Sequence, residues 1–186
     1  MKITKISQMN PLVREILITL ALVLIFYGIF NLVLETRGID QTSMEPTIEP
    51  GERFFVNKIS YRLHDPERGD IIILHSPHDP AGTPNIKRII GLPGETIAIK
   101  NGTVYINGCV LEEPYLTQPT TGTLAATVIP ANNYFVMGDH RSVSMDSRHW
   151  GTLQREDIIG KAVWRYWPFS KFGPAPNEKP VLSGTS

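Results

Sequence analysis

Cysteine is almost absent from this chain of 186 residues: Cys109 stands alone, so no disulfide can form within the chain. The sequence holds no CxxC pair and no Cys/His cluster with zinc spacing, and we expect no metal and no other cofactor. On a predicted strand, a single cysteine such as Cys109 is expected to be a small buried hydrophobe. Lysine plus arginine number 18, as do aspartate plus glutamate, so the formal net charge is +0. This balance gives no overall basic character, and we expect no nucleic-acid partner.

Several signatures of common enzyme classes are also missing. The sequence contains no P-loop, no GxGxxG and no GxSxG motif, and it shows no internal repeat of about 20 residues or more. Any catalytic chemistry must therefore come from a less common arrangement of residues.

Charge is absent from residues 16–34, ILITLALVLIFYGIFNLVL, a run of 19 residues. This length is close to the roughly 20 residues that a helix needs to cross the hydrocarbon core of a bilayer. A buried core helix would need a larger protein around it. A cleaved signal peptide would have a shorter apolar segment and a small-residue cleavage site, which the following Glu35-Thr36-Arg37 does not provide. The sequence therefore predicts an uncleaved transmembrane anchor over residues 16–34.

The charges that flank the apolar run indicate its orientation. Lys2, Lys5 and Arg14 precede it, with Glu15 as the one opposing charge. Because positive residues stay on the cytoplasmic side, residues 1–15 are predicted to be a short cytoplasmic N-terminus. The rest of the chain should lie on the outer face of a plasma or thylakoid-type membrane, with the lipid bilayer as a partner.

Residues 35–168 have the pattern of one mainly β domain. Asn101-Gly102 and Asn107-Gly108 are strong hairpin signals, and they predict a meander over residues 96–111. Short segments rich in β-branched or aromatic residues predict further strands, and together the predicted strands cover residues 53–59, 70–75, 86–91, 96–100, 103–106, 133–137 and 158–166. Many short strands between frequent turns predict an antiparallel, β-rich domain of barrel or sandwich type.

Two segments of the chain show no such pattern. Residues 112–132 are rich in threonine and proline and are predicted to form a long loop or flap. The proline-rich tail, residues 169–186, has no hydrophobic periodicity and is predicted to be poorly ordered.

The residues alone leave the chemistry open. Ser43 lies in the turn-like stretch QTSMEPTIEP, where a serine usually hydrogen-bonds nearby backbone. A Ser-His-Asp hydrolase is compatible with the composition, and His140, in Gly-Asp-His-Arg, has the clearest local context of the five histidines. A lysine whose pKa is lowered by burial can also serve as the base for a serine. Lys87, which alternation places on one strand face with Ile89 and Gly91, fits that role or that of a solvent-facing lysine.

Four segments, taken together, resemble the conserved boxes of type I signal peptidases, membrane-anchored Ser-Lys endopeptidases that remove signal peptides. They are SMEPTI at 43–48, RGDII at 68–72, KRIIGLPGE at 87–95 and GDHRSVSMDSR at 138–148. Their order, their spacing and their position after an anchor all match, and the resemblance extends over residues 15–168.

The resemblance implies a role for each matching residue. Ser43 would be the nucleophile and Lys87 the general base of an acyl-enzyme mechanism. Ser144 would hydrogen-bond the lysine and orient it, and Asp146 with Arg148 would form a charged pair that supports the site. In the same loop, Asp139 and Arg141 would either have a direct role or form ion pairs that brace the loop. Gly91, Pro93 and Gly94 would shape the turn after the lysine strand.

The oxyanion hole is where this sequence departs from the family pattern. The Ser43 backbone N–H would be one donor, and part of the family has a hydroxyl residue two positions earlier as the second. This chain has Gln41 there, whose amide could donate instead. Further departures are His140, where asparagine is usual, and Ser142-Val143, where polar residues are common.

The implied substrates are preproteins whose signal peptides end in small residues at a membrane surface. Ser43 lies nine positions after Leu34, which would keep it near the outer face of the membrane. Met44, Ile48 and Ile86 are expected to line shallow apolar pockets for a peptide that adds as a strand.

Two other functions remain compatible with parts of the pattern. A self-cleaving repressor with a Ser-Lys pair would carry a DNA-binding helix-turn-helix, which no stretch of this sequence fits. A non-catalytic β-rich module on an anchor would not need Ser43 or Lys87.

Overall fold

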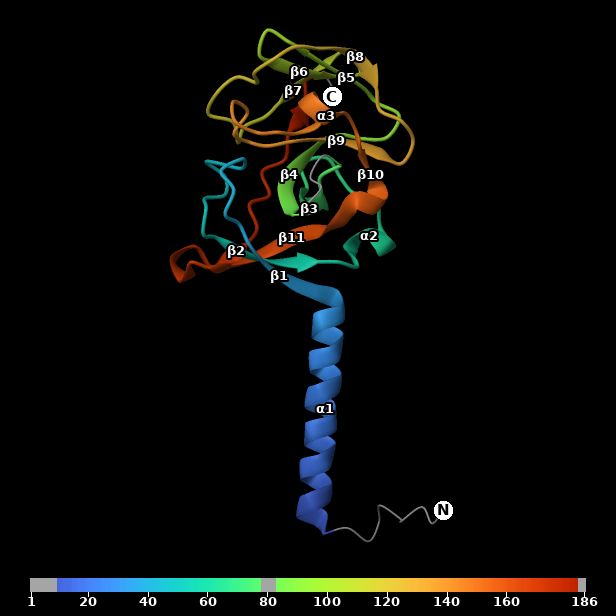
Figure 1. Ribbon diagram of the computed structural model, residues 1–186, viewed down its shortest axis with the longest axis vertical. Coiled ribbons are helices and arrows are strands. Elements are labelled where there is room, and N and C mark those ends of the chain that lie inside the picture. The colour runs from blue at the N-terminus through green and yellow to red at the C-terminus, as the bar shows by residue number, and fades with distance from the viewer. Residues whose placement is uncertain (1–9, 78–82, 184–186) are drawn as a thin grey trace.

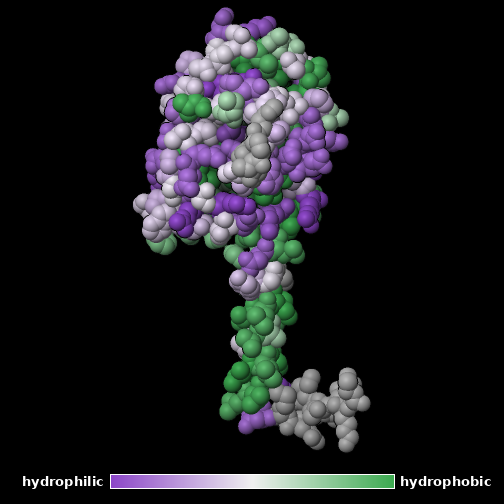
Figure 2. Space-filling view, viewed as in Figure 1, coloured by the Kyte–Doolittle hydropathy of each residue, from purple (hydrophilic) through white to green (hydrophobic). Residues whose placement is uncertain are grey.

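The computed structural model describes residues 10–77 and 83–183. The predictions for Lys2 and Lys5, most of the predicted cytoplasmic segment and the end of the tail lie outside these residues. Helix α1 (Pro11–Val33) begins five residues before the predicted anchor, because Asn10 caps its first turn through the Leu12 N–H and Pro11 occupies the first helical position. Within the described residues, α1 is the one helix long and apolar enough to cross a membrane. It projects from the domain (Figure 1), and its surface is mostly hydrophobic (Figure 2).

Helix α1 joins the domain without a loop. Strand β1 (Leu34–Gly38) follows α1 directly and pairs with β2 (Arg53–Asn57). Lys58, just after β2, donates its backbone N–H to the carbonyl of Val33 and its Nζ to the carbonyl of Asn31, both at 3.0 Å. The ring of Phe30 meets Phe55 of β2 edge-on, with 6.0 Å between the centroids. The last turn of α1 is therefore attached to the sheet at several points.

The larger sheet has eight strands, and every pairing in it is antiparallel. Its order is β1-β2-β11-β3-β4-β9-β10, with β12 beside β11. The remaining members are β3 (Ile71–His75), β4 (Pro84–Gly91), β9 (Asn133–Met137), β10 (Leu153–Gln154), β11 (Ile158–Trp167) and β12 (Gly173–Pro174). Strand β4 lies between β3 and β9, near the middle of this sheet.

A second sheet of five strands lies at the end of the domain away from α1 (Figure 1). Its order is β13-β7-β6-β5-β8, made by β5 (Thr96–Lys100), β6 (Thr103–Ile106), β7 (Cys109–Glu112), β8 (Leu124–Val128) and β13 (Val181–Leu182). Asn101 and Gly102 have φ of 50° and 80°, and Asn107 and Gly108 have 52° and 85°, as two-residue hairpin turns require. The prediction of a mainly antiparallel β domain behind an N-terminal apolar helix is confirmed.

Short helices complete the fold: α2 (Ser60–Leu63), α3 (Ser147–Trp150) and the 3₁₀ turns η2 (Arg155–Asp157) and η3 (Phe169–Lys171). The buried apolar residues form three clusters. One lies around Met44, Phe54 and Ile86, and another joins Ile90 and Met137 to the second sheet. The third includes Ile72, Ile89 and Val136. The strand that carries Lys87 therefore contributes to all three clusters.

Three predictions about individual segments were wrong. The stretch 112–132 is not all loop, because β8 lies within it and pairs with β5. The tail is ordered through residue 183: Gly173–Pro174 and Val181–Leu182 pair with β11 and β7, and Ala175 and Pro180 are buried. The prolines of the tail hid its strand pairing from the sequence pattern, but the residues between the prolines supply backbone N–H groups for hydrogen bonds. Cys109 is exposed: it is the first residue of β7, directly after the Asn107-Gly108 turn, where the core no longer covers the strand.

Candidate active site

Ser43 lies in a turn that the core holds in place. The carbonyl of Met44 accepts the N–H of Ile48 at 2.9 Å, and both of these side chains are completely buried. The carbonyl of Ser43 accepts the N–H of His140 at 3.0 Å, so the turn is also tied to the loop after β9. Ser43 itself is only 9% exposed. Its hydroxyl therefore has a fixed position just beneath the surface.

Lys87, in the middle of β4, reaches this hydroxyl. Its Nζ donates to Ser43 Oγ at 2.8 Å, and its side chain is buried. Burial lowers the pKa of Lys87 from 10.5 to about 8, because an ammonium loses solvation in this environment. The carboxylate of Asp146 opposes this shift, and the nearby Arg148 guanidinium adds to it. A substantial fraction of Lys87 is therefore neutral near pH 8, the state that can accept a proton.

Asp146 and Arg148 form a tight ion pair in the loop after β9. Asp146 accepts hydrogen bonds from Arg148 Nε and Nη2, both at 2.8 Å, and from the Gly138 N–H at 2.9 Å. Its carboxylate also caps α3 through the Arg148 backbone N–H at 3.2 Å. Burial by itself would raise the pKa of Asp146, but Arg148 and the Gly138 N–H outweigh it and hold the pKa below its usual range. Asp146 is therefore a buried anion that fixes this loop.

Ser144 does not make the hydrogen bond that the family resemblance implies. Its Oγ is buried and makes no hydrogen bond to Lys87, but it lies close enough to Asp146 to help lower the pKa of that carboxyl. The side chain instead lies against Gly138, where a Cβ would overlap both Ser144 Oγ and the carbonyl oxygen of Ser43. Gly138 is thus a residue whose importance the sequence reasoning missed. Its absent side chain lets the loop approach the Ser43 turn.

A second ion pair lies behind the lysine strand. Arg88 Nε and Nη2 donate to the two carboxylate oxygens of Asp139 at 2.9 and 2.7 Å, and both side chains are fully buried. Arg88 also stacks on the ring of Tyr115 at 3.8 Å. In the same loop, Arg141 pairs with Glu113. Asp139 and Arg141 thus connect the loop to β4 and to the segment after β7, whereas sequence reasoning gave Arg88 no role.

Two of the residues that depart from the family pattern, Gln41 and His140, contact backbone near Ser43. Gln41 donates its Nε2 to the carbonyl of Pro84 at 3.2 Å, while its Oε1 is buried without a partner in the described part of the chain. His140 Nδ1 lies 3.3 Å from the carbonyl of Thr42 and 3.4 Å from a carboxylate oxygen of Glu45. One of the two N–H groups of the Gln41 amide is thus engaged with Pro84.

The residues expected to line open pockets are buried instead. Met44, Ile48 and Ile86 are at most 1% exposed and belong to the core cluster beneath the Ser43 turn. Met44 and Ile48 pack into the core from the turn and Ile86 from β4, and their part in binding a peptide stays a prediction. A small cavity of about 200 Å³ is lined by Glu45, Pro46, Thr117, Gln118, Asp139, His140 and Arg141. Among the described residues, no group of three or more His, Cys, Asp or Glu could hold a metal ion.

Comparison with known proteins identifies close similarity over most of the chain. Residues 12–167 match the family described as "Signal peptidase, peptidase S26". The "Probable signal peptidase I-2" of Synechocystis sp. is 42% identical over 156 residues, which cover 81% of this chain and 71% of the relative. The "Signal peptidase I" of Leptolyngbya laminosa is 42% identical over 171 residues, 88% of this chain and 84% of the relative. A solved signal peptidase I from Enterococcus faecalis V583 is 35% identical, with a TM-score of 0.48, covering 53% of this chain and 97% of that chain.

Proposed function

This chain belongs to the signal peptidase family, peptidase S26, and from that membership we propose a membrane-bound endopeptidase that removes N-terminal signal peptides from exported preproteins. In this proposal Ser43 is the nucleophile and Lys87 the general base of a dyad. The observation that carries the assignment is the 2.8 Å hydrogen bond between Lys87 Nζ and Ser43 Oγ in a buried setting. Nucleophile and base lie within hydrogen-bond reach, as this type of catalysis requires.

The reaction follows from the protonation state of the lysine. Neutral Lys87 takes the proton of Ser43 Oγ as that oxygen attacks the scissile carbonyl. The resulting ammonium then donates a proton to the leaving amine, and an acyl-enzyme remains on Ser43. Lys87, neutral again, removes a proton from the water that attacks the ester. Because burial lowers its pKa to about 8, Lys87 can pass through both protonation states near neutral pH.

The tetrahedral intermediate needs donors for its oxyanion. The backbone N–H of Ser43 is suited to this role, since it donates to no group within the described residues. Gln41 is the proposed second donor, since its Nε2 carries two N–H groups and one of them is used on the carbonyl of Pro84. Asp146 and Arg148 support the site from behind by holding Gly138 and the loop that ties the Ser43 turn.

Membrane attachment gives the enzyme access to its substrates. We propose a cytoplasmic segment at residues 1–15, an anchor at 16–34 and a peptidase domain at 35–168 on the outer face of a plasma or thylakoid-type membrane. Side chains that suit a lipid interface support this arrangement, since tryptophan and phenylalanine favour that region. The exposed ones are Trp164, Trp167, Phe169 and Phe172, at the end of β11 and in and beside η3.

The decisive experiment incubates the purified full chain in detergent with a signal-peptide-bearing preprotein. Ser43→Ala, Lys87→Ala and Lys87→Arg should each lower kcat/KM by at least about 10³-fold, since loss of a nucleophile or base has effects of this size or greater. Ser142→Ala and Lys100→Ala are matched controls on exposed side chains and should keep wild-type rates. Full activity of Lys87→Arg would refute the dyad. Unchanged preprotein processing by Ser43→Ala and Lys87→Ala would support the non-catalytic module.

A further inference from the structure

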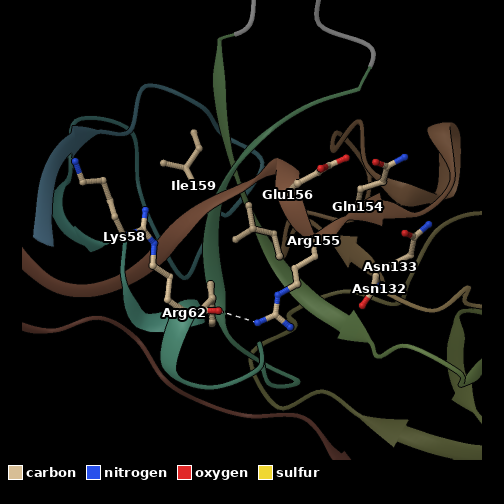
Figure 3. Close-up of a pocket in the computed structure, with 10 residues that line it drawn as sticks. Lys58, Arg62, Asn132, Asn133, Gln154, Arg155, Glu156 and Ile159 are labelled. Carbon is tan, nitrogen blue, oxygen red and sulfur yellow. Dashed lines mark hydrogen bonds between the residues drawn. The ribbon is translucent and has the colours of Figure 1, made fainter. Parts of the chain in front are cut away.

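A large pocket lies away from the proposed active site, beside the outer end of α1. Its volume is about 770 Å³, and it lies between α2, the start of β9 and the η2 turn before β11. Its lining residues are Lys58, Tyr61, Arg62, Asn132, Asn133, Gln154, Arg155, Glu156, Ile158 and Ile159. In Figure 3, Lys58 and Arg62 stand at one end of the pocket, Asn132 and Asn133 at the other, and Arg155 between them. The proposed peptidase mechanism uses none of these residues.

The charge of this pocket favours an anion. Three of the side chains that line it are cationic, and Glu156 is the one acid among those ten described lining residues. Arg155 is already engaged, since it pairs with Asp65 and donates to the carbonyl of Tyr61 at 2.7 Å. The guanidinium of Arg62 is different: it is exposed and has no hydrogen-bond or ion-pair partner within residues 10–77 and 83–183. A guanidinium that is free to donate two parallel hydrogen bonds matches the geometry of a phosphate.

The position of the pocket indicates where such an anion would come from. Lys58 lines the pocket and also donates its Nζ to the carbonyl of Asn31, two residues before the end of α1. If α1 crosses the membrane, this end of the helix lies among the lipid headgroups. Leu63, next to Arg62, is 80% exposed and presents an apolar side chain to the solvent. Cations beside an exposed leucine suit a phospholipid, whose phosphate adjoins its acyl chains.

We propose that Lys58 and Arg62, with Arg155 behind them, bind the phosphate of an anionic phospholipid from the membrane that holds α1. The asparagine and glutamine side chains in the same pocket supply further donors for the headgroup. This site rests on the membrane anchoring proposed above and not on the peptidase chemistry. It would fix the domain against the bilayer at a second point beside the anchor.

The test titrates the purified full chain in detergent with dioctanoyl phosphatidylglycerol, dioctanoyl phosphatidylcholine or inorganic phosphate, and native mass spectrometry measures the bound fraction. Phosphatidylglycerol should bind at least about tenfold more tightly than phosphatidylcholine, because it alone carries a net negative charge. Arg62→Gln should weaken this binding about fivefold, the usual effect of one cation near an anionic lipid surface. Arg62→Lys should restore most of it. Lys100→Gln removes an exposed cation at the β5–β6 turn and should leave it unchanged.

Several outcomes would overturn the site. These are equal binding of the two lipids, an Arg62→Gln variant that keeps the full preference, or equal weakening by Lys100→Gln. Inorganic phosphate that binds as tightly as phosphatidylglycerol would indicate a site for soluble phosphate rather than for a lipid. The assay involves no cleavage, and Ser43→Ala should bind lipid as the wild type does. An absent lipid preference would therefore not count against the proposed peptidase function. Failed preprotein cleavage would likewise not count against the lipid site.

Discussion

Replacing Lys87 with methionine should abolish peptide cleavage and also stabilise the fold at neutral pH. Methionine has a similar length and no charge, so it can occupy the buried position without the cost of desolvating an ammonium. That cost follows from the pKa of Lys87, which burial lowers from 10.5 to about 8. A difference of roughly 2.5 units corresponds to about 3 kcal/mol, at 1.36 kcal/mol per unit.

The stability advantage of Lys87→Met over the wild type should decrease as the pH rises. Between pH 8 and 10.5 the unfolded wild type binds more protons than the folded wild type, because its Lys87 has the higher pKa. The free energy of unfolding of the wild type therefore rises with pH across this window. The variant has no titrating group at position 87, so its free energy of unfolding lacks this rise. The advantage of Lys87→Met should be about 3 kcal/mol at pH 7 and less than about 0.5 kcal/mol at pH 10.5.

Thermal unfolding of the full chain in detergent, at pH 7 and at pH 10.5, measures this difference. For a domain of this size, about 3 kcal/mol should raise Tm by roughly 6–12 °C at pH 7. Lys100→Met, at an exposed position, is the matched control and should show little change at either pH. A Lys87→Met variant less stable than wild type at pH 7, or an advantage that stays constant up to pH 10.5, would refute the reasoning.

Three further outcomes are expected. Since the neutral form of Lys87 is the active base, kcat/KM for a signal-peptide substrate should rise about tenfold per unit below pH 8 and level off above it; a flat profile from pH 6 to 9 would contradict this. Gly138→Ala should lower kcat/KM by about 10²-fold with little change in circular dichroism, because the new methyl group displaces the carbonyl of Ser43; wild-type kinetics would show that this contact is unimportant. Asp146→Asn should lower the free energy of unfolding by about 3 kcal/mol or more, because Arg148 loses its buried partner. Urea unfolding in detergent measures this change, and a loss well below about 3 kcal/mol would contradict the prediction.

The parts of the fold that could be predicted from the sequence depend on local signals. The anchor follows from nineteen residues without charge, and the meander follows from two Asn-Gly pairs. Lys87 could be proposed as a buried base because its neighbours on the same strand are apolar. In each case the residues that carry the information lie within a few positions of one another.

The features that were missed depend on contacts between distant residues. Arg88 was given no role from the sequence, because its partner Asp139 lies 51 residues away and its contact with the Glu178 carbonyl spans 90. Met44 and Ile86 looked like pocket residues because each adjoins a proposed catalytic residue. Their burial depends on how the turn at 43–48 packs against the sheet, which no local pattern encodes.

The direct passage from α1 into β1 has a mechanical consequence. A flexible linker would let the domain move independently of the helix, but here the helix end is bonded to Lys58 through both backbone and side chain. In a membrane, helix and domain should therefore tilt as one rigid body. Transmembrane helices tilt by about 20° on average, by an amount that varies with bilayer thickness. The thickness of the bilayer would then set how far the Ser43 turn lies above the membrane surface and in which direction it faces a preprotein substrate.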